Sequence, residues 1–194
     1  MKCLQHILLL FLTIFLLSCK DEKSVTPTNM VFEIPAFTDT GANVIAYKAN
    51  GTTYRSYDFS GLTDGLTCIR IFDLSRPEKE HVLYIEGKTI EKNAFHSIRI
   101  TIQNANDTGR YFLKEKTPLN ENQGLFRYGK SETVYYNYIT TNEFTGYIDI
   151  KKLDTVNKIV AGKFKFKARY NDWGIPSIDT FNITEGQFDL IYYQ

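Results

Sequence analysis

Hydrophobic and polar residues alternate with a period of two along many short segments of the chain. Between residues 98 and 102 isoleucine alternates with polar residues, and between 163 and 169 lysine or arginine alternates with Phe164, Phe166 and Ala168. A period of two places successive side chains on opposite faces of a β-strand. These segments therefore predict strands that turn one face to a hydrophobic core and the other to water.

From Asn43 onward, strand-length segments are separated by turn-forming residues, and no convincing amphipathic helix interrupts them. The predicted strands are Asn43–Lys48, Thr52–Asp58, Thr67–Leu74, Glu80–Glu86, His96–Gln103, Arg110–Lys114, Thr133–Thr140, Glu143–Lys152, Lys158–Tyr170, Ser177–Asn182 and Glu185–Tyr193. Most connections are short, which favours antiparallel neighbours over parallel crossovers. The sequence predicts one all-β domain, a single antiparallel, meander-rich β-sandwich or β-barrel of about 9–11 strands.

The register of one hairpin can be predicted from its side chains. A turn at residues 153–157 would place Ile150 opposite Val160 on the inner face of the sheet. On the outer face, Tyr147 would then lie opposite Lys163, and Glu143 opposite Lys167. Hydrophobic burial and charge pairing agree in this register, whereas a slip of one residue would break both.

The first residues carry the pattern of an export signal. Lys2 precedes an apolar run, Ile7–Leu17, of about 11 residues, whereas a membrane-spanning helix needs about 20. The run ends in Leu16-Leu17-Ser18-Cys19, which resembles the bacterial lipobox. That resemblance implies cleavage before Cys19 and a lipid on its thiol, and two or three acyl chains would give stable anchoring.

These features divide the chain into a signal peptide (residues 1–18), a lipidated N-terminus and tether (19–42) and the all-β domain (43–194). Asp21 and Glu22 almost directly follow the cysteine, and a short acidic run there resembles the export signal of surface lipoproteins in Bacteroidota. We expect an outer-membrane lipoprotein displayed on the cell surface. The alternative is the periplasmic face of the same membrane.

Charge and cysteine content narrow the classes of partner. The formal net charge of +1 gives no general attraction to nucleic acid or to anionic surfaces. Of the three cysteines, Cys3 leaves with the signal peptide and Cys19 is expected to carry the lipid. Cys68 then has no disulfide partner within the mature chain, so stability must come from the core.

Several motifs place glycines at bends and aromatic residues in the expected core. They are Gly146-Tyr147-Ile148-Asp149-Ile150 with Leu153-Asp154, Ile159-Val160-Ala161-Gly162-Lys163-Phe164-Lys165-Phe166, Ile183-Thr184-Glu185-Gly186-Gln187-Phe188-Asp189, the Asn50-Gly51 turn and Gly109-Arg110-Tyr111. Together they resemble a family of Bacteroidota lipoproteins of unknown function, over most of the mature chain. The resemblance implies a lipid anchor and an all-β fold, and it implies no activity.

The standard catalytic motifs are absent from the sequence, including the Gly-x-Ser-x-Gly elbow, His-Glu-x-x-His and the phosphate loop. Cys68 with His81 or His96 could form a nucleophilic pair, but a lone cysteine in a strand is more often a small buried hydrophobe. Residues 104–109 with Glu115 echo the spacing of a calcium loop, although a hairpin turn explains them better. We expect no enzyme activity, no metal and no cofactor.

Aromatic residues supply the first candidate ligand contacts. Trp173 lies in an evident loop, where a ring can stack on a sugar, anchor a protein partner or plug the end of the sheet. Tyr136 and Tyr138 share one face of a strand and could line a groove, with core packing as the alternative.

Two further features concern charge and modification. The row Lys163, Lys165, Lys167 and Arg169 could meet anionic glycans or lipid headgroups, and the alternative is a solvated strand face that opposes aggregation. Asp154-Thr155-Val156 resembles the Bacteroidota O-glycosylation signal and lies in a predicted turn, which makes Thr155 a candidate attachment residue.

These observations favour a non-catalytic envelope lipoprotein that binds a glycan, a peptide or a partner protein through one end of its β-domain. The alternative is a structural or assembly component of an outer-membrane complex, joined through strand addition at an exposed edge. A hydrolase comes third, because it would need a cleft that gathers histidines or carboxylates from separate strands.

Overall fold

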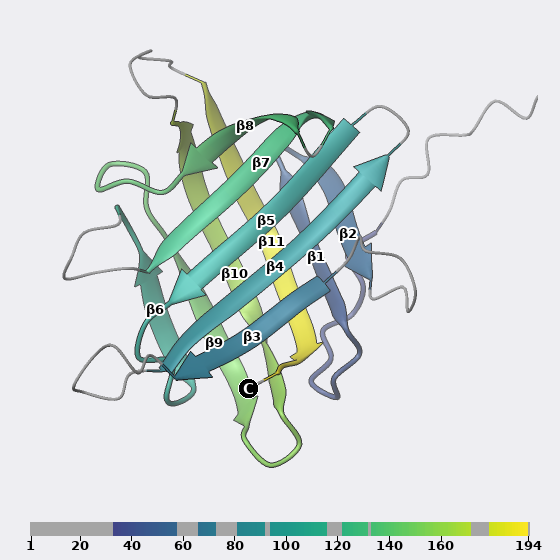
Figure 1. Ribbon diagram of the computed structural model, residues 1–194, viewed down its shortest axis with the longest axis vertical. Coiled ribbons are helices and arrows are strands. Elements are labelled where there is room, and N and C mark those ends of the chain that lie inside the picture. Colours follow the sequence, from purple (N-terminus) through teal and green to yellow (C-terminus); the bar gives the residue numbers. More distant parts are fainter. Residues whose placement is uncertain are drawn as a thin grey trace, which may run out of the picture. The chain divides into compact units, whose positions relative to one another are not determined.

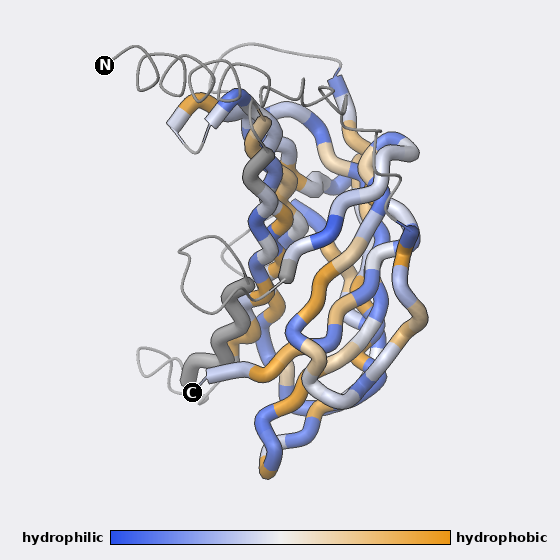
Figure 2. Tube along the Cα trace, turned by 90° about the vertical axis from the view of Figure 1, so that its right-hand side faces the viewer, coloured by the Kyte–Doolittle hydropathy of each residue, from blue (hydrophilic) through white to orange (hydrophobic). Residues whose placement is uncertain are grey.

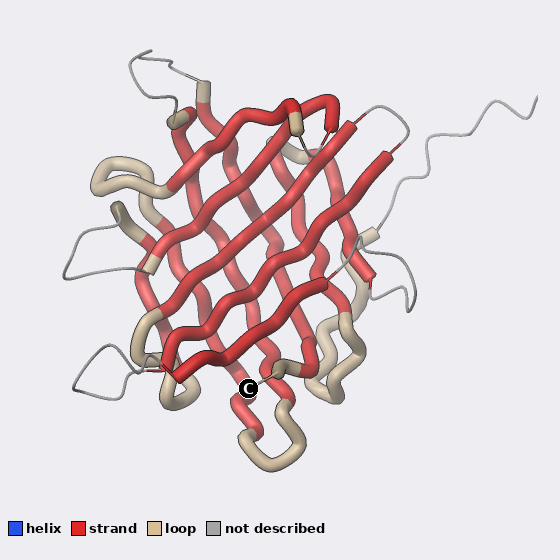
Figure 3. Tube along the Cα trace, viewed as in Figure 1, coloured by secondary structure: helices blue, strands red, loops and turns tan. Residues whose placement is uncertain are grey.

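The structure is a computed structural model that describes residues 33–57, 66–72, 81–91, 94–115, 122–131, 133–171 and 179–193. Within these ranges the chain forms β-strands and no helix (Figure 3), which confirms the predicted all-β class. The strands are β1 (Val44–Ala49), β2 (Thr52–Tyr57), β3 (Leu66–Phe72), β4 (His81–Glu91), β5 (Ala94–Ile102), β6 (Gly109–Leu113), β7 (Gln123–Ser131), β8 (Val134–Ile139), β9 (Gly146–Asp154), β10 (Ile159–Tyr170) and β11 (Thr180–Ile191). A search of this part of the chain for a helix able to span a membrane finds none.

All these strands belong to one antiparallel sheet, in the order β2-β1-β11-β10-β8-β7-β5-β4-β3, with β9 paired to β10 and β6 paired to β9. The branch lies along one edge of the long strand β10. Residues 159–166 of that edge pair with β9, and residues 169–170 pair with β8. The sheet thus has two halves, and Figure 1 shows the strands β3, β4, β5 and β7 crossing in front of β1, β10 and β11.

The hydrophobic core lies between the two halves of the sheet. Ile98 and Ile100 of β5, Phe126 of β7, and Phe164 and Phe166 of β10 are buried in one cluster. Figure 2 shows hydrophobic and hydrophilic positions interleaved along the strands, as the period of two predicts. Full burial of each such side chain contributes about 1.5–3 kcal/mol relative to exposure.

The sheet does not close on itself within the described residues, because β2 and β3 end the strand order without pairing with each other. Side chains bridge β2 to β4 instead. Ser56 Oγ lies 3.1 Å from Thr89 Oγ1, and Thr89 donates a hydrogen bond of 3.2 Å to the carbonyl of Arg55. The result is an open, folded-over sheet that is sandwich-like, one of the two architectures that the sequence predicts.

The β9–β10 hairpin shows where the predicted register is wrong. Ile150 lies opposite Gly162 and not opposite Val160, a difference of two residues. The turn itself occupies residues 155–158, where Asp154 Oδ1 accepts hydrogen bonds from two backbone N–H groups at 3.0 and 2.9 Å. From Gly162 onward this shift is an even number, so the side chains there keep their predicted faces. A bulge between Ala161 and Gly162 makes the shift three residues nearer the turn, where Val160 lies opposite Leu153.

Residues 33–43, here called the strap, run along the outer face of β11 before β1 begins. The carboxylate of Asp189 accepts a hydrogen bond of 2.7 Å from Thr38 Oγ1. It also accepts bonds of 3.0 and 2.7 Å from the backbone N–H groups of residues 40 and 41. Because the strap covers them, Asp189 and Gln187 are buried although they alternate with core residues along β11.

Candidate functional site

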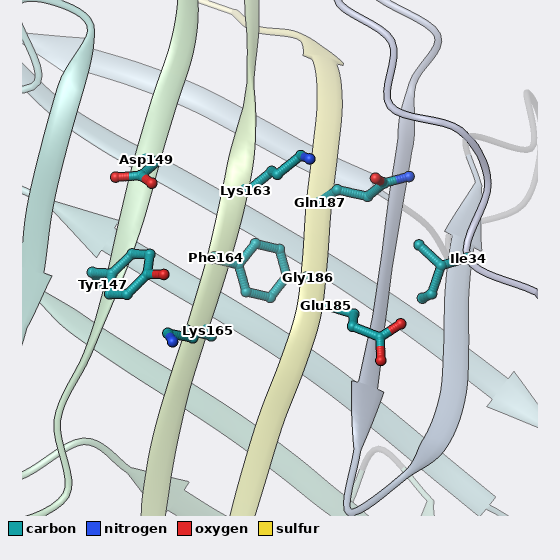
Figure 4. Close-up of a pocket in the computed structure, with 9 residues that line it drawn as sticks. All are labelled: Ile34, Tyr147, Asp149, Lys163, Phe164, Lys165, Glu185, Gly186 and Gln187. Carbon is teal, nitrogen blue, oxygen red and sulfur yellow. The ribbon is translucent and has the colours of Figure 1, made fainter.

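A hollow of about 370 Å³ opens on the outer face of β9, β10 and β11. It is lined by Ile34, Tyr147, Asp149, Lys163, Phe164, Lys165, Glu185, Gly186 and Gln187. Figure 4 shows these side chains projecting from neighbouring strands and from the strap around the backbone of Gly186. The volume lies at the lower end of the range of about 300–1,000 Å³ that small-ligand sites occupy.

The floor of the hollow forms at a bulge in β11. The pairing of β10 with β11 shifts between Phe164 and Phe166, and Glu185 adopts a φ of 51°, in the left-handed region. A bulge of this kind bends its strand and increases the local twist. The next residue is Gly186, where a Cβ would overlap the ring of Phe164. The bend and the missing side chain together leave the depression above Phe164.

Two lysines on β10 are the cations that line the hollow. Lys163 Nζ lies 5.4 Å from the ring centroid of Phe37 in the strap, and Lys165 Nζ lies 5.1 Å from that of Tyr147. Neither lysine forms an ion pair with any residue in the described ranges. Aromatic rings, rather than carboxylates, therefore position both ammonium groups.

The two carboxylates of the lining are already paired with cations outside it. Asp149 Oδ1 and Oδ2 accept hydrogen bonds of 2.7 and 2.8 Å from Arg110, and this pairing holds the pKa of Asp149 below its ordinary value. Lys151 approaches the same carboxylate at 3.8 Å. Glu185 Oε1 accepts a hydrogen bond of 2.7 Å from Lys48. The negative charges of the lining are thus neutralised by cations outside it, and the hollow keeps the positive charges of Lys163 and Lys165.

The strap forms one wall of the hollow. Gln187 Nε2 donates a hydrogen bond of 2.6 Å to the carbonyl of Pro35. This bond holds Ile34 beside the lining residues of β11, and it orients the amide of Gln187 at the edge of the hollow. The wall depends in turn on Asp189, which fixes the following residues of the strap.

The tyrosines singled out by the sequence lie elsewhere, in the other half of the sheet. The ring centroids of Tyr136 and Tyr138 both lie 5.6 Å from that of Tyr170. Tyr138 is only 6 % exposed and packs in the core, where burial raises the pKa of its hydroxyl, whereas Tyr136 is 56 % exposed. Trp173 and Cys19 lie outside the described residues.

A larger group of rings fills the same end of the core. The centroid of Phe181 lies 4.6 Å from that of Tyr138 and 5.7 Å from that of Tyr128. His96 lies between Tyr54 and Tyr128, at 4.4 and 5.1 Å. These rings come from both halves of the sheet, so core packing accounts for most of them. The side chain of Cys68, in β3, lies outside the described part.

The remaining candidates fall on turns. Thr155 is exposed in the β9–β10 turn. In the run that echoes a calcium loop, Asp107 Oδ1 accepts a hydrogen bond of 2.7 Å from the backbone of Thr108, and its carbonyl accepts one of 2.9 Å from Tyr111. Among the described residues, no three His, Cys, Asp or Glu side chains gather where they could hold a metal ion.

The lysines of the hollow were identified from the sequence as a possible binding surface, but the other residues that line the hollow were not predicted. The outward direction of Tyr147 and Asp149 could be predicted, because they alternate along β9 with isoleucines that are buried. Glu185 and Gln187 could not be predicted from the sequence, since their places in the lining depend on a bulge and on a strap that lies about 150 residues away along the chain.

The fold and the hollow define an all-β domain with an open, cation-lined depression on one sheet face. No protein-family model matches the chain, and comparison with curated proteins and with solved structures finds no match. The chemistry of the hollow must therefore be inferred from its own residues.

Proposed function

We propose that the protein is a lipid-anchored, non-catalytic module of a bacterial outer membrane that binds an anionic glycan in the hollow. The observation that carries the proposal is that Lys163 and Lys165 line a hollow of about 370 Å³ without an ion-pair partner in the described part of the chain. The lipid on Cys19, the display on the cell surface and the kinship with Bacteroidota lipoproteins belong to the proposal and rest on sequence motifs.

The two lysines are suited to an acidic group. A lysine ammonium has three donors, and one that lies over a ring keeps them for another acceptor. Residues two apart on a strand face are about 7 Å apart, so both ammonium groups can reach one carboxylate, sulfate or phosphate, or two neighbouring ones. Hydrogen bonds between charged groups are roughly twice as strong as neutral ones.

The other lining groups favour a sugar over an acidic peptide. Glu185 pairs with Lys48 through one oxygen, and its side chain is 56 % exposed. A carboxylate accepts several hydrogen bonds, so Glu185 can still accept them from hydroxyl groups. A ligand with both acid and hydroxyl groups satisfies the lysines and this carboxylate together, whereas the ionised side chains of an acidic peptide offer the carboxylate no hydrogen-bond donor.

A pair of matched double variants tests the proposal. Lys163→Ala with Lys165→Ala is expected to weaken binding of a galacturonic acid tetrasaccharide or a sulfated tetrasaccharide at least about 10-fold, because each lost charged hydrogen bond costs about 1.5 kcal/mol or more. The control is Lys167→Ala with Arg169→Ala, which removes the same charge from the same face of β10 outside the hollow. Calorimetric titration of the full mature chain provides the measurement.

Several results would contradict the proposal. Equal losses in both double variants would mean that general electrostatic attraction, and not the hollow, binds the probe. Tighter binding of hexaglutamate than of either acidic tetrasaccharide would point to a peptide ligand. Loss on Tyr136→Ala alone would place the site at the aromatic end of the core. A neutral tetrasaccharide of the same length is expected not to bind measurably.

We also propose that Thr155 carries an O-linked glycan in the native host. Its place in an exposed turn gives a transferase access, and the neighbouring Val156 is 86 % exposed. Intact-mass measurement of the natively expressed protein is expected to show an added sugar mass that Thr155→Ala removes and Thr133→Ala retains. A mass equal to that of the lipidated polypeptide would refute the modification.

A further inference from the structure

The structure carries a second contact position beside the hollow. Given the proposed function, on which this step rests, we infer that the ligand is an acidic oligosaccharide, and that Phe112 of β6 is the platform on which a neighbouring sugar ring stacks. Phe112 is 59 % exposed, which is unusual for a phenylalanine in a described strand of this protein.

The pairing of three strands places Phe112 in line with the hollow. Phe112 lies opposite Tyr147 in the β6–β9 pair, and Tyr147 lies opposite Lys165 in the β9–β10 pair. Residues that are opposite in a sheet share a face. The Arg110–Asp149 hydrogen bonds, one position along, confirm that the outer face continues across β6 and β9. Phe112 therefore lies on the same face of the sheet as the hollow, on the strand next to β9.

The spacing suits a chain of sugars. Neighbouring strands are about 4.8 Å apart, so Phe112 and Lys165 stand about 10 Å apart across β9. A disaccharide spans that distance, with its acid group at Lys165 and its second ring over Phe112. A single acidic sugar held by the lysines would not reach β6.

Phe112 and Tyr147, the two aromatic residues that lie side by side across β6 and β9, differ in what their rings contact. Arg110 Cζ lies 3.9 Å from the ring centroid of Tyr147, and Lys165 also approaches that ring. Tyr147 is thus engaged in holding cations. Phe112 contacts no aromatic ring or cation in the described residues, so its ring is open to a ligand. Apolar C–H faces of a sugar ring are the natural complement of such an aromatic surface.

The experiment compares ligand lengths. Phe112→Ala is expected to weaken binding of the galacturonic acid tetrasaccharide, or of its sulfated counterpart, about 5-fold. It is expected to leave the binding of monomeric galacturonate unchanged. Lys163→Ala with Lys165→Ala weakens both lengths. The control is Tyr193→Ala, which removes an aromatic ring that is 69 % exposed and does not line the hollow.

The outcomes separate the two proposals. If Phe112→Ala leaves tetrasaccharide binding unchanged while the double lysine variant weakens it, the stacking platform is wrong and the anion site stands. Equal losses for monomer and tetrasaccharide on Phe112→Ala would also overturn the platform, since the monomer should not reach it. If neither acidic tetrasaccharide binds the wild-type chain, the proposed function and this inference fall together.

Discussion

Replacing Asp189 by alanine is expected to lower the free energy of unfolding by about 3 kcal/mol, because it removes the buried acceptor of three part-buried hydrogen bonds that hold the strap on β11. The carboxylate is 1 % exposed and accepts three hydrogen bonds of 3.0 Å or less. Chemical denaturation of wild type and variant, monitored by tyrosine and tryptophan fluorescence, measures this change in unfolding free energy. Ligand binding should weaken as well, because the strap forms a wall of the hollow.

The contribution of Asp189 should also depend on pH. Burial raises the pKa of its carboxyl, but hydrogen bonds from Thr38 and from the backbone of residues 40–42 outweigh it and leave the pKa lowered. A lowered folded-state pKa means that the stabilisation is fully present above about pH 5 and is lost as the pH falls through that pKa. The difference in unfolding free energy between wild type and Asp189→Asn should therefore shrink in acid.

An exposed aspartate provides the control. Asp154 also has a lowered pKa, through hydrogen bonds with Asn157, but it serves a solvent-facing turn. Asp154→Ala is expected to cost about 1 kcal/mol or less, comparable to the loss of a helix cap. A loss for Asp189→Ala as small as the loss expected for Asp154→Ala would show that the strap contributes little to stability.

Gly186→Ala is the second large effect, with an expected destabilisation of about 3 kcal/mol from overpacking. The new Cβ would overlap the ring of Phe164, which is 2 % exposed, and would lie 2.6 Å from the backbone carbonyl oxygen of the same residue. Displacing that ring would also disturb the floor of the hollow. Thermal and denaturant unfolding measure the stability, and titration with the acidic tetrasaccharide measures the site.

Gly124 offers a graded comparison for this substitution. It also lies against a buried phenylalanine, but a Cβ there would meet the Phe166 ring at 3.1 Å, so the ring needs to give by only a few tenths of an ångström. Gly124→Ala is expected to cost about 1 kcal/mol or less, since alanine is otherwise better than glycine inside a strand. A larger loss at Gly124 than at Gly186 would contradict the steric explanation.

Most strands follow from the alternation of side chains, and the exceptions have identifiable causes. The strand β7 was not predicted, because Gly124 and Gly129 interrupt its pattern and glycine weakens a strand locally. It forms because tertiary contacts use the glycines: Phe166 packs over Gly124, and β8 passes close to Gly129. The two final predicted strands are one, β11, because the chain continues through the bulge at Glu185.

The candidate site was harder to predict from the sequence than the fold was. The lysines of β10 were visible as a row, but a solvated strand face gives the same row. Lys163 and Lys165 differ from Lys167 because they lie beside the bulge in β11, which forms through pairing with β10. Lys163 also lies near a ring of the strap, which comes from a distant segment of the chain. Phe112 had no signal of its own, because its exposure follows from the pairing of β6 with β9.

The strap has a practical consequence for any shortened version of the protein. A chain that starts at Val44 would contain every residue of the described strands. It would nevertheless lack Ile34 and Phe37, and it would leave the carboxylate of Asp189 and the amide of Gln187 facing water in place of their partners. Such a fragment is expected to be less stable and to bind ligands of the hollow more weakly than the full chain, so recombinant versions for ligand screening should begin before Glu33.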